Sequence, residues 1–226
     1  MTKEEIDYAL YHVPEHADYA VDSSELDAED IEPGRVEILE SMIAVDIDDP
    51  ANDYKHFAAA RILCSWGYRC GFDIISQYVF REDLMEGPGD ISHRLRGYNT
   101  GYEHALMAIW SYHATQSDRG YDPKERKVTD SRYAQESRKL IFDATVKIVE
   151  YSNIKKFEIT DLYGSLKYYK YEEYYSHIKN HLLSIIENPE FHHWKIFDAL
   201  EFLNGVDPEF VASVLKPRGK TIADYK

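Results

Sequence analysis

Two histidines with helical spacing are the first candidates for chemistry in this chain. His177 and His181 lie four positions apart, which places them on one helix face where they could bind a metal. The zinc-protease pattern needs a glutamate directly after the first histidine, but position 178 is isoleucine. No third ligand is recognisable nearby, and the adjacent His192 and His193 point apart on a helix. The sequence therefore predicts no bound metal and no cofactor.

The other reactive side chains do not complete a catalytic motif. Cys64 and Cys70 have no recognisable base beside them, so we expect buried structural cysteines. Adjacent carboxylates such as Glu82 and Asp83 are expected by chance in a chain with 41 acidic residues. Neither a nucleophile elbow nor a glycine-rich phosphate loop occurs. The sequence thus favours a protein that is not an enzyme.

The net charge is concentrated in the first quarter of the chain. Residues 1–53 contain 17 acidic residues and only two basic ones, Lys3 and Arg35. This stretch therefore carries the whole formal charge of −15, because residues 54–226 hold 24 acids and 24 bases. An acidic arm on a neutral body favours a basic protein partner and opposes binding to the phosphates of nucleic acid.

A tyrosine-rich run is the second distinctive feature. Six tyrosines fall within residues 163–175, and they cannot all face one helical core. We expect Tyr171, Tyr174 and Tyr175 in the core, and Tyr168 and Tyr169 are suited to a protein interface because tyrosine offers a large area with a polar tip. The partner-binding surface predicted from both features comprises Asp18, Asp22, Glu25, Asp27, Glu29, Asp30, Tyr168, Tyr169, Glu172 and Glu173.

The apolar residues follow helical spacing almost throughout. Stripes with i, i+3, i+4 and i+7 spacing run through residues 102–113, 133–148 and 171–185. No segment has the alternation of a convincing strand. These patterns predict an all-α protein of about nine helices.

Turn residues predict several helix boundaries. Asn188-Pro189 and Asp207-Pro208 each have the pattern of an N-cap followed by proline at the first helical position. Gly67 and Gly205 follow apolar runs, where a helix commonly ends in a left-handed residue.

A weak internal repeat connects two parts of the chain. One copy comprises Asp49-Pro50, Ala58–Leu63, Trp66-Gly67 and Phe72–Ile75. The other comprises Asn188-Pro189, Phe197–Leu200, Asn204-Gly205 and Phe210–Ala212. The pattern resembles HEAT-type helical repeats, in which two-helix units stack on one another. The resemblance implies an irregular, short α-solenoid of stacked helical hairpins.

Domain organisation and location follow from composition. We expect residues 1–33 to form an acidic segment, partly flexible or packed on the body, and residues 34–226 to form the helical-repeat-like domain. The N-terminus lacks the features of a signal peptide, and no apolar run approaches the ~20 residues that span a bilayer. The sequence predicts a cytoplasmic protein without a membrane partner.

In size, acidity and lack of catalytic residues, the chain is similar to acidic bacterial immunity proteins. That resemblance implies a non-enzymatic inhibitor that neutralises a basic toxin, for example a nuclease, by acidic and aromatic contacts. The first alternative is a helical-repeat scaffold or adaptor without a toxin partner. The second is an enzyme of unrecognised type that uses His104, His113 or the loop with Arg94 and Arg96.

Overall fold

The protein is predominantly helical. The computed structural model describes residues 1–49, 54–87, 92–93, 98–124, 127–128 and 131–226, and roughly two thirds of these are helical. The predicted all-α class is therefore confirmed. The described residues contain eleven α-helices, where about nine were expected. One addition, α5 (Glu82–Met85), is a single turn, which is too short for helical periodicity to reveal.

The described chain divides into two compact units, and the division falls inside helix α7 (Arg132–Tyr151). The first unit comprises Met1–His93 and Asn99–Thr145, and the second comprises Tyr98 and Val146–Lys226. The expected boundary at residue 33 lies within the first unit.

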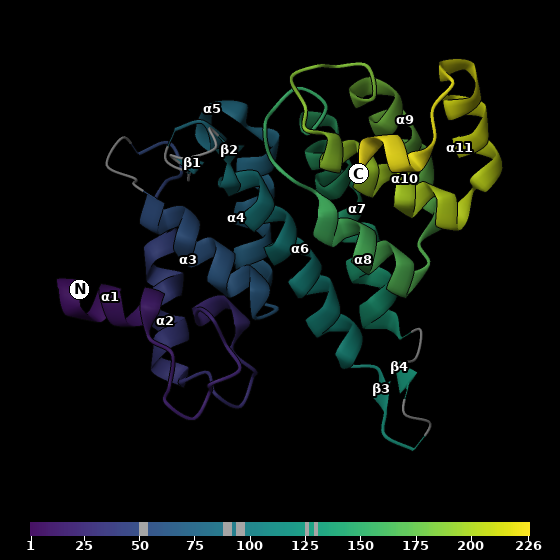
Figure 1. Ribbon diagram of the computed structural model, residues 1–226. Helices are drawn as coiled ribbons and strands as arrows, with labels where there is room; N and C mark the ends of the chain where they lie inside the picture. Colours follow the sequence, from purple (N-terminus) through teal and green to yellow (C-terminus); the bar gives the residue numbers. More distant parts are fainter. Residues whose placement is uncertain (50–53, 88–91, 94–97, 125–126, 129–130) are drawn as a thin grey trace. The chain divides into compact units, whose positions relative to one another are not determined.

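The first unit is built around helix α3. Its helices are α1 (Lys3–Tyr11), α2 (Pro33–Ile43), α3 (Tyr54–Ser65), α4 (Arg69–Phe80), α5 and α6 (Thr100–Asp118), with a 3-10 turn η1 (Ser23–Glu25). Helix α3 packs against α2, α4 and α6 (Figure 1). Its apolar residues Phe57, Ala59, Ala60, Ile62 and Leu63 are almost completely buried. This helix therefore forms the centre of the unit's core.

Two glycines shape the connection and the packing of α3 and α4. Gly67 has the left-handed conformation that the sequence predicted, with a φ of +83°. The amide nitrogen of Tyr68 donates to the carbonyl of Leu63 at 2.9 Å, which closes the helix end. At Gly71, a Cβ atom would lie 2.3 Å from the backbone nitrogen of Cys64. The close packing of α3 on α4 therefore requires glycine at this position.

The second unit is centred on helix α10. It contains the end of α7, followed by α8 (Thr160–Tyr169), η2 (Glu172–Tyr174), α9 (Tyr175–Ile185), α10 (His193–Val206), α11 (Pro208–Leu215), η3 (Lys216–Arg218) and η4 (Ile222–Tyr225). Helix α10 contacts α8, α9, α11 and η4. Leu200 and Leu203 are fully buried in this helix, and Phe197 is half-buried.

Two of the predicted helix boundaries are wrong. Helix α10 begins at His193, whereas Asn188 lies in a turn and its side chain accepts a hydrogen bond from the amide of Glu190. Gly205 lies inside α10 and not beyond it, because the helix continues to Val206. The boundary at Asp207-Pro208 is correct, since the Asp207 carboxylate accepts a hydrogen bond from the amide of Phe210 at 3.0 Å.

Four two-residue strands complete the described secondary structure: β1 (Ser92–His93), β2 (Tyr98–Asn99), β3 (Tyr121–Asp122) and β4 (Lys127–Val128). Strands β3 and β4 pair in antiparallel fashion beyond the end of α6 (Figure 1). Such short strands cannot produce a detectable alternation in the sequence. None of the described helices has the length and apolarity that a membrane span requires.

Candidate functional site

Residues 12–32, the part of the predicted acidic segment between α1 and α2, are called the acidic segment from here on. Its only regular element is η1, and single-turn hydrogen bonds shape the rest, for example from the amide of Ala17 to the carbonyl of Pro14 at 2.9 Å. Of its apolar residues, Ala17 and Leu26 are buried. The segment is therefore folded against its unit, and specific polar contacts hold it there.

Arg35 is the main anchor of the acidic segment. Only 2% of this residue is exposed. Its Nε donates to the carbonyl of Ala9 at 3.0 Å and its Nη2 donates to Ser23 Oγ at 2.6 Å. The guanidinium also lies over the rings of Tyr8 and Trp66, at 5.8 and 5.2 Å from their centres. Burial lowers the pKa of Arg35, and the nearby charges of Tyr8 and Glu32 oppose that effect.

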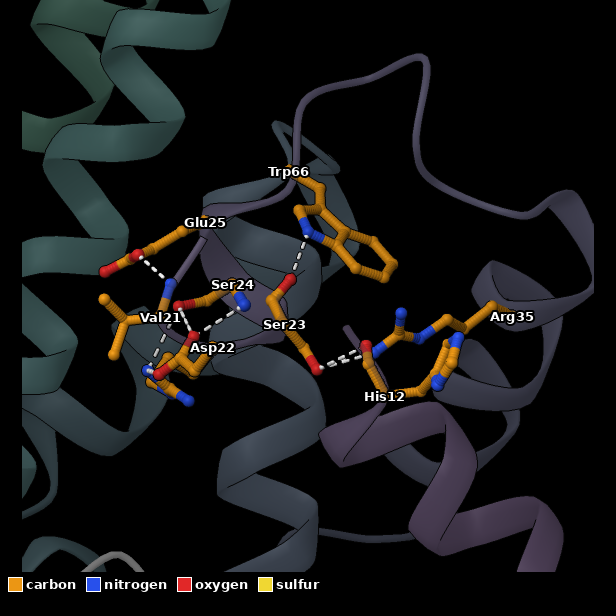
Figure 2. A network of polar contacts seen from close by, with 9 residues as sticks. His12, Val21, Asp22, Ser23, Ser24, Glu25, Arg35 and Trp66 are labelled. Atoms are coloured by element: carbon orange, nitrogen blue, oxygen red, sulfur yellow. Dashed lines mark hydrogen bonds and ion pairs between the residues drawn. The ribbon is translucent and has the colours of Figure 1, made fainter. Parts of the chain in front are cut away.

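Ser23 connects this anchor to helices α1 and α3. Figure 2 shows Ser23 between Arg35 and Trp66. The Ser23 hydroxyl donates to the carbonyl of His12 at 3.2 Å, and the Ser23 carbonyl accepts from Trp66 Nε1 at 2.8 Å. The buried polar atoms of Ser23 are thus satisfied, and the middle of the segment is held against the end of α3.

Asp22 has a structural role beside this anchor. One of its carboxylate oxygens accepts from the Ser24 amide at 2.7 Å and from the Ser24 hydroxyl at 2.5 Å. The other forms an ion pair with Arg61 at 3.1 Å. Burial raises the pKa of Asp22, but the hydrogen bonds from Ser24 and the charge of Arg61 outweigh it and lower the pKa. Its negative charge is therefore already matched within the chain.

Glu25 and Asp30 are also engaged within the segment. A carboxylate oxygen of Glu25 accepts from the amide of Val21 at 2.7 Å. Asp30 accepts from the Tyr19 hydroxyl at 2.5 Å and contacts His16 Nε2 at 2.8 Å. These two hydrogen bonds, first that of Tyr19 and then that of His16, lower the pKa of Asp30.

The three remaining predicted acids are exposed. Asp18, Asp27 and Glu29 have no ion pair within the part of the chain that the structure describes. Of the two bases in residues 1–53, Lys3 is exposed and Arg35 is buried. The outer surface of the acidic segment therefore presents uncompensated carboxylates from a fixed backbone.

The predicted tyrosines and their neighbouring glutamates lie in the second unit. Tyr168 is 72% exposed and meets Tyr169 edge to face, with ring centres 4.9 Å apart. Tyr169 in turn stacks on Tyr171 at 5.2 Å. Glu172 is exposed and Glu173 is half-buried. These residues form an aromatic cluster with adjacent acids within the second unit.

Of the three tyrosines that were expected in the core, one is fully buried. Tyr174 is fully buried, but Tyr171 and Tyr175 are half-buried. Tyr171 lies outside α9, and the left-handed residue Lys170, with a φ of 56°, turns the chain after α8. The sequence stripe assumed one helix over residues 171–185, but α9 begins at Tyr175 after the 3-10 turn η2, so the stripe placed too many tyrosines on the inner face.

His181 belongs to a buried polar network in the second unit. Its Nδ1 lies 2.7 Å from Asn153 Oδ1 and 3.1 Å from Ser152 Oγ. Burial, with a smaller effect from the charge of Lys195, lowers the pKa of His181 to about 3. His177, on the same helix, is half-buried. Within the described ranges, no three His, Cys, Asp or Glu side chains come together as metal ligands.

Lys195 completes the network and was not recognised in the sequence. It is 2% exposed, and its Nζ donates to the carbonyls of Ser152 and Phe157, each at 2.8 Å. Ser152 directly follows helix α7, so the ammonium lies where the helix dipole is negative. The lysine thereby stabilises the C-terminal end of α7. A lone lysine in an amphipathic helix gives no signal of this role.

Of the candidate enzymatic residues, the structure describes the two histidines of α6, and their charged neighbours differ. His113 is buried against Ser137 Oγ at 2.8 Å, and burial lowers its pKa to about 4. Burial, followed by the charge of Arg61, lowers the pKa of His104. Arg94 and Arg96 lie outside the described residues. The enzyme alternative that uses this loop therefore stays a prediction.

Burial also raises the pKa values of both cysteine thiols, that of Cys64 strongly. Cys64 donates to the carbonyl of Ala108 at 3.3 Å, whereas Cys70 is half-buried near Glu40. A raised thiol pKa opposes nucleophilic chemistry at neutral pH.

Comparisons with known proteins identify no relative: no protein-family model, curated protein or solved structure matches this chain.

Proposed function

We propose that this protein binds and inhibits a basic protein partner through its acidic segment. The observation that carries the proposal is the exposure of Asp18, Asp27 and Glu29 on a segment fixed by Arg35. Fixed carboxylates lose little entropy when a cationic surface binds them, so they favour both fast encounter and specificity.

The sharper form of the proposal is an immunity protein that blocks the active site of a toxin. Enzymes that cleave nucleic acid need a cationic site to hold phosphates, and an acidic protein can occupy such a site by charge mimicry. The exposed Tyr168 and its neighbour Tyr169 offer aromatic area for a second contact. This form of the proposal includes that the protein is bacterial and acts in the cytoplasm.

A scaffold of stacked helical hairpins is the alternative. The packing of α3 on α4 and of α10 on α11 supports it, because each pair is a hairpin of adjacent helices. Gly205 weighs against the second repeat copy, since it lies inside α10 and not in a turn like Gly67. The HEAT-like relationship therefore has better support in the first unit.

The test begins with the partner itself. The tagged protein is used to capture proteins from its native host, and a captured candidate is purified and its affinity is measured. The proposal requires a partner with a basic contact surface and, for an enzyme or toxin, loss of its activity at a 1:1 ratio. A partner whose activity is unchanged at saturation would instead support the scaffold.

Matched charge variants then locate the contact. Asp18→Asn, Asp27→Asn and Glu29→Gln are combined in one variant, and Glu190→Gln, Glu201→Gln and Glu209→Gln in another. All six side chains are exposed, and both variants change the net charge equally. We expect only the first to weaken binding, by roughly tenfold or more. Equal effects of the two variants on the affinity would show that the interaction is only non-specific charge attraction.

A further inference from the structure

The first unit contains a large groove beside the acidic segment. It has a volume of about 830 Å³ and is open to solvent. Its walls come from residues 26–37, from the turn between α3 and α4, and from the last turn of α6. Every lining residue belongs to the first unit, so the groove is defined within that unit alone.

The groove combines an apolar base with an acidic edge. Leu26, Val36 and Trp66 line it and are buried residues. Asp27, Glu37 and Asp118 also line it, and their side chains are exposed. Within the described part of the chain, none of these three carboxylates forms an ion pair. Apolar surface and free negative charge thus occur together in one concave place.

Among the described residues, one positive charge lines the groove, and it is partly engaged elsewhere. Arg119 is exposed, and its guanidinium lies over the ring of Tyr133 at 5.4 Å. Three carboxylates against one guanidinium leave the lining negative. Arg35 lies over the Trp66 ring but is not part of the lining.

We propose that this groove binds an extended segment of a protein partner that carries arginine or lysine next to apolar residues. Arginine and lysine have long apolar stems that can cover the base while the charged head reaches carboxylates at the edge. The combination excludes an acidic or purely apolar occupant, because the three carboxylates would be buried without compensation. The inference rests on the proposed function, and it names the groove as the place where the basic partner is contacted.

A short peptide tests the groove directly. The probe is the synthetic peptide Gly-Leu-Arg-Leu-Arg-Gly, and its control replaces both arginines by citrulline, which has the same shape and no charge. Binding is followed by two-dimensional ¹⁵N–¹H NMR of the full chain, where the indole N–H of Trp66 reports on the groove. We expect saturable shifts at Trp66 and at the amides of residues 26–28 and 118–119.

Two variants establish that the shifts come from the groove. Asp27→Asn combined with Asp118→Asn removes two edge charges, and Ala28→Arg places a cation at an exposed lining position. We expect each to weaken peptide binding by roughly fivefold or more. The exposed double variant Glu190→Gln and Glu201→Gln is the charge-matched control and should bind as the wild type does. Thermal melts confirm that all variants are folded.

Several results would overturn the inference. Equal affinity for the arginine and citrulline peptides would show that the groove does not distinguish a charged peptide from a neutral one. Equal affinity for spermine would indicate a small polycation site and not a peptide site. Unchanged binding by both groove variants would exclude the location.

The outcome also separates this inference from the proposed function. If the captured partner binds normally to the Ala28→Arg variant, the groove inference fails while the proposed function stands. If the peptide binds in the groove but no basic protein partner is found, the proposed function fails while the peptide site stands.

Discussion

Arg35 shows how one buried side chain can fix the position of many exposed ones. Its guanidinium donates hydrogen bonds to the carbonyl of Ala9 and to the hydroxyl of Ser23. The carbonyl of Ser23 in turn accepts a hydrogen bond from the indole of Trp66. Without this cation, the carboxylates of the acidic segment would still repel one another, and Ser23 would lose a buried hydrogen-bond donor. This buried arginine therefore fixes the backbone from which the acidic side chains are presented.

Replacing Arg35 by methionine is expected to destabilise the protein by about 2–3 kcal/mol, because two buried oxygen atoms lose their donor while the apolar stem remains. Arg132→Met is the control, since this exposed arginine forms a surface ion pair with Glu136 one turn away, and it should cost less than about 0.5 kcal/mol. Urea denaturation measures both. A loss as small for Arg35 as for Arg132 would contradict its role as an anchor.

Buried histidines give the stability a defined pH dependence. Burial lowers the pKa of His181 to about 3 and that of His113 to about 4, whereas unfolded histidine titrates near 6.5. Below about pH 6.5 the unfolded chain therefore binds these protons and the folded chain does not. The free energy of unfolding should fall with decreasing pH, by about 1.4 kcal/mol per pH unit for each histidine.

The comparison of unfolding at about pH 7 and about pH 5 tests this, because most carboxylates remain ionised in that window. His181→Gln and His113→Gln should each reduce the slope by one proton, and the double variant by two. The two histidines lie in different units, so their effects should add. A variant slope parallel to that of the wild type would show that the residue does not titrate on unfolding.

At the scale of elements, two glycines that look alike in the sequence have opposite roles. Gly67 occupies a left-handed turn, and a Cβ atom there would lie 2.6 Å from Thr115 Cγ2. Gly205 is inside helix α10, where a Cβ atom would meet nothing within 4 Å. The different backbone conformations, and not the residue type, determine the effect of a substitution.

Gly67→Ala is therefore expected to destabilise the protein by more than about 1 kcal/mol, through strain and the contact with Thr115. Gly205→Ala should stabilise it by about 0.5–1 kcal/mol, because alanine is the better helix former. Thermal and urea unfolding of the two variants gives the comparison. Effects of the same sign would mean that the helix assignment at Gly205 is wrong.

The core of α10 gives a further expected value. Leu200 is fully buried, and Leu200→Ala should cost about 2–5 kcal/mol by loss of contacts and creation of a cavity. The exposed Glu201→Ala, one position along, is the control and should change stability by less than about 0.5 kcal/mol. A similar small change for Leu200 in urea unfolding would show that this face is not buried.

The sequence predicted the helices far better than the contacts that fix the site. The stripe from Tyr102 to His113 is buried as expected, because one long helix imposes its own period. Tyr133 was expected inside and is half-exposed, because it lies in the first turn of α7. Arg35, Ser23 and Trp66 meet across 43 residues, and no local pattern reveals such a contact. The set of six acids was thus selected by charge alone, without knowing that Asp22, Glu25 and Asp30 are already engaged.

At the scale of the whole molecule, the uneven charge is the property that a partner meets first. All of the net charge of −15 arises from residues 1–53, whose only arginine is buried. The field of exposed carboxylates extends over about a Debye length, roughly 10 Å at 0.1 M salt. Long-range attraction of this kind changes the rate of encounter more than the lifetime of the complex.

Association with the basic partner should therefore slow as salt rises from about 0.1 M to about 1 M, where the Debye length falls to about 3 Å. Neutralising Asp18, Asp27 and Glu29 should lower the on-rate and flatten its salt dependence. Neutralising Asp22, Glu25 and Asp30 as well should add a loss of stability, because their hydrogen bonds hold the segment. Tyr168→Ala should instead raise the off-rate, since an exposed aromatic ring contributes contact area after docking.

Stopped-flow measurement of both rates at several salt concentrations separates these effects. The control is the variant of the second unit in which Glu190, Glu201 and Glu209 are replaced by glutamine. The salt dependence of its association rate should match that of the wild type. A salt-independent on-rate, together with wild-type association of the three-acid variant, would leave the acidic segment only a solubilising role. The inhibitor proposal would then fail, because steering requires the charges to act before contact. The helical scaffold would replace it as the better account of this protein.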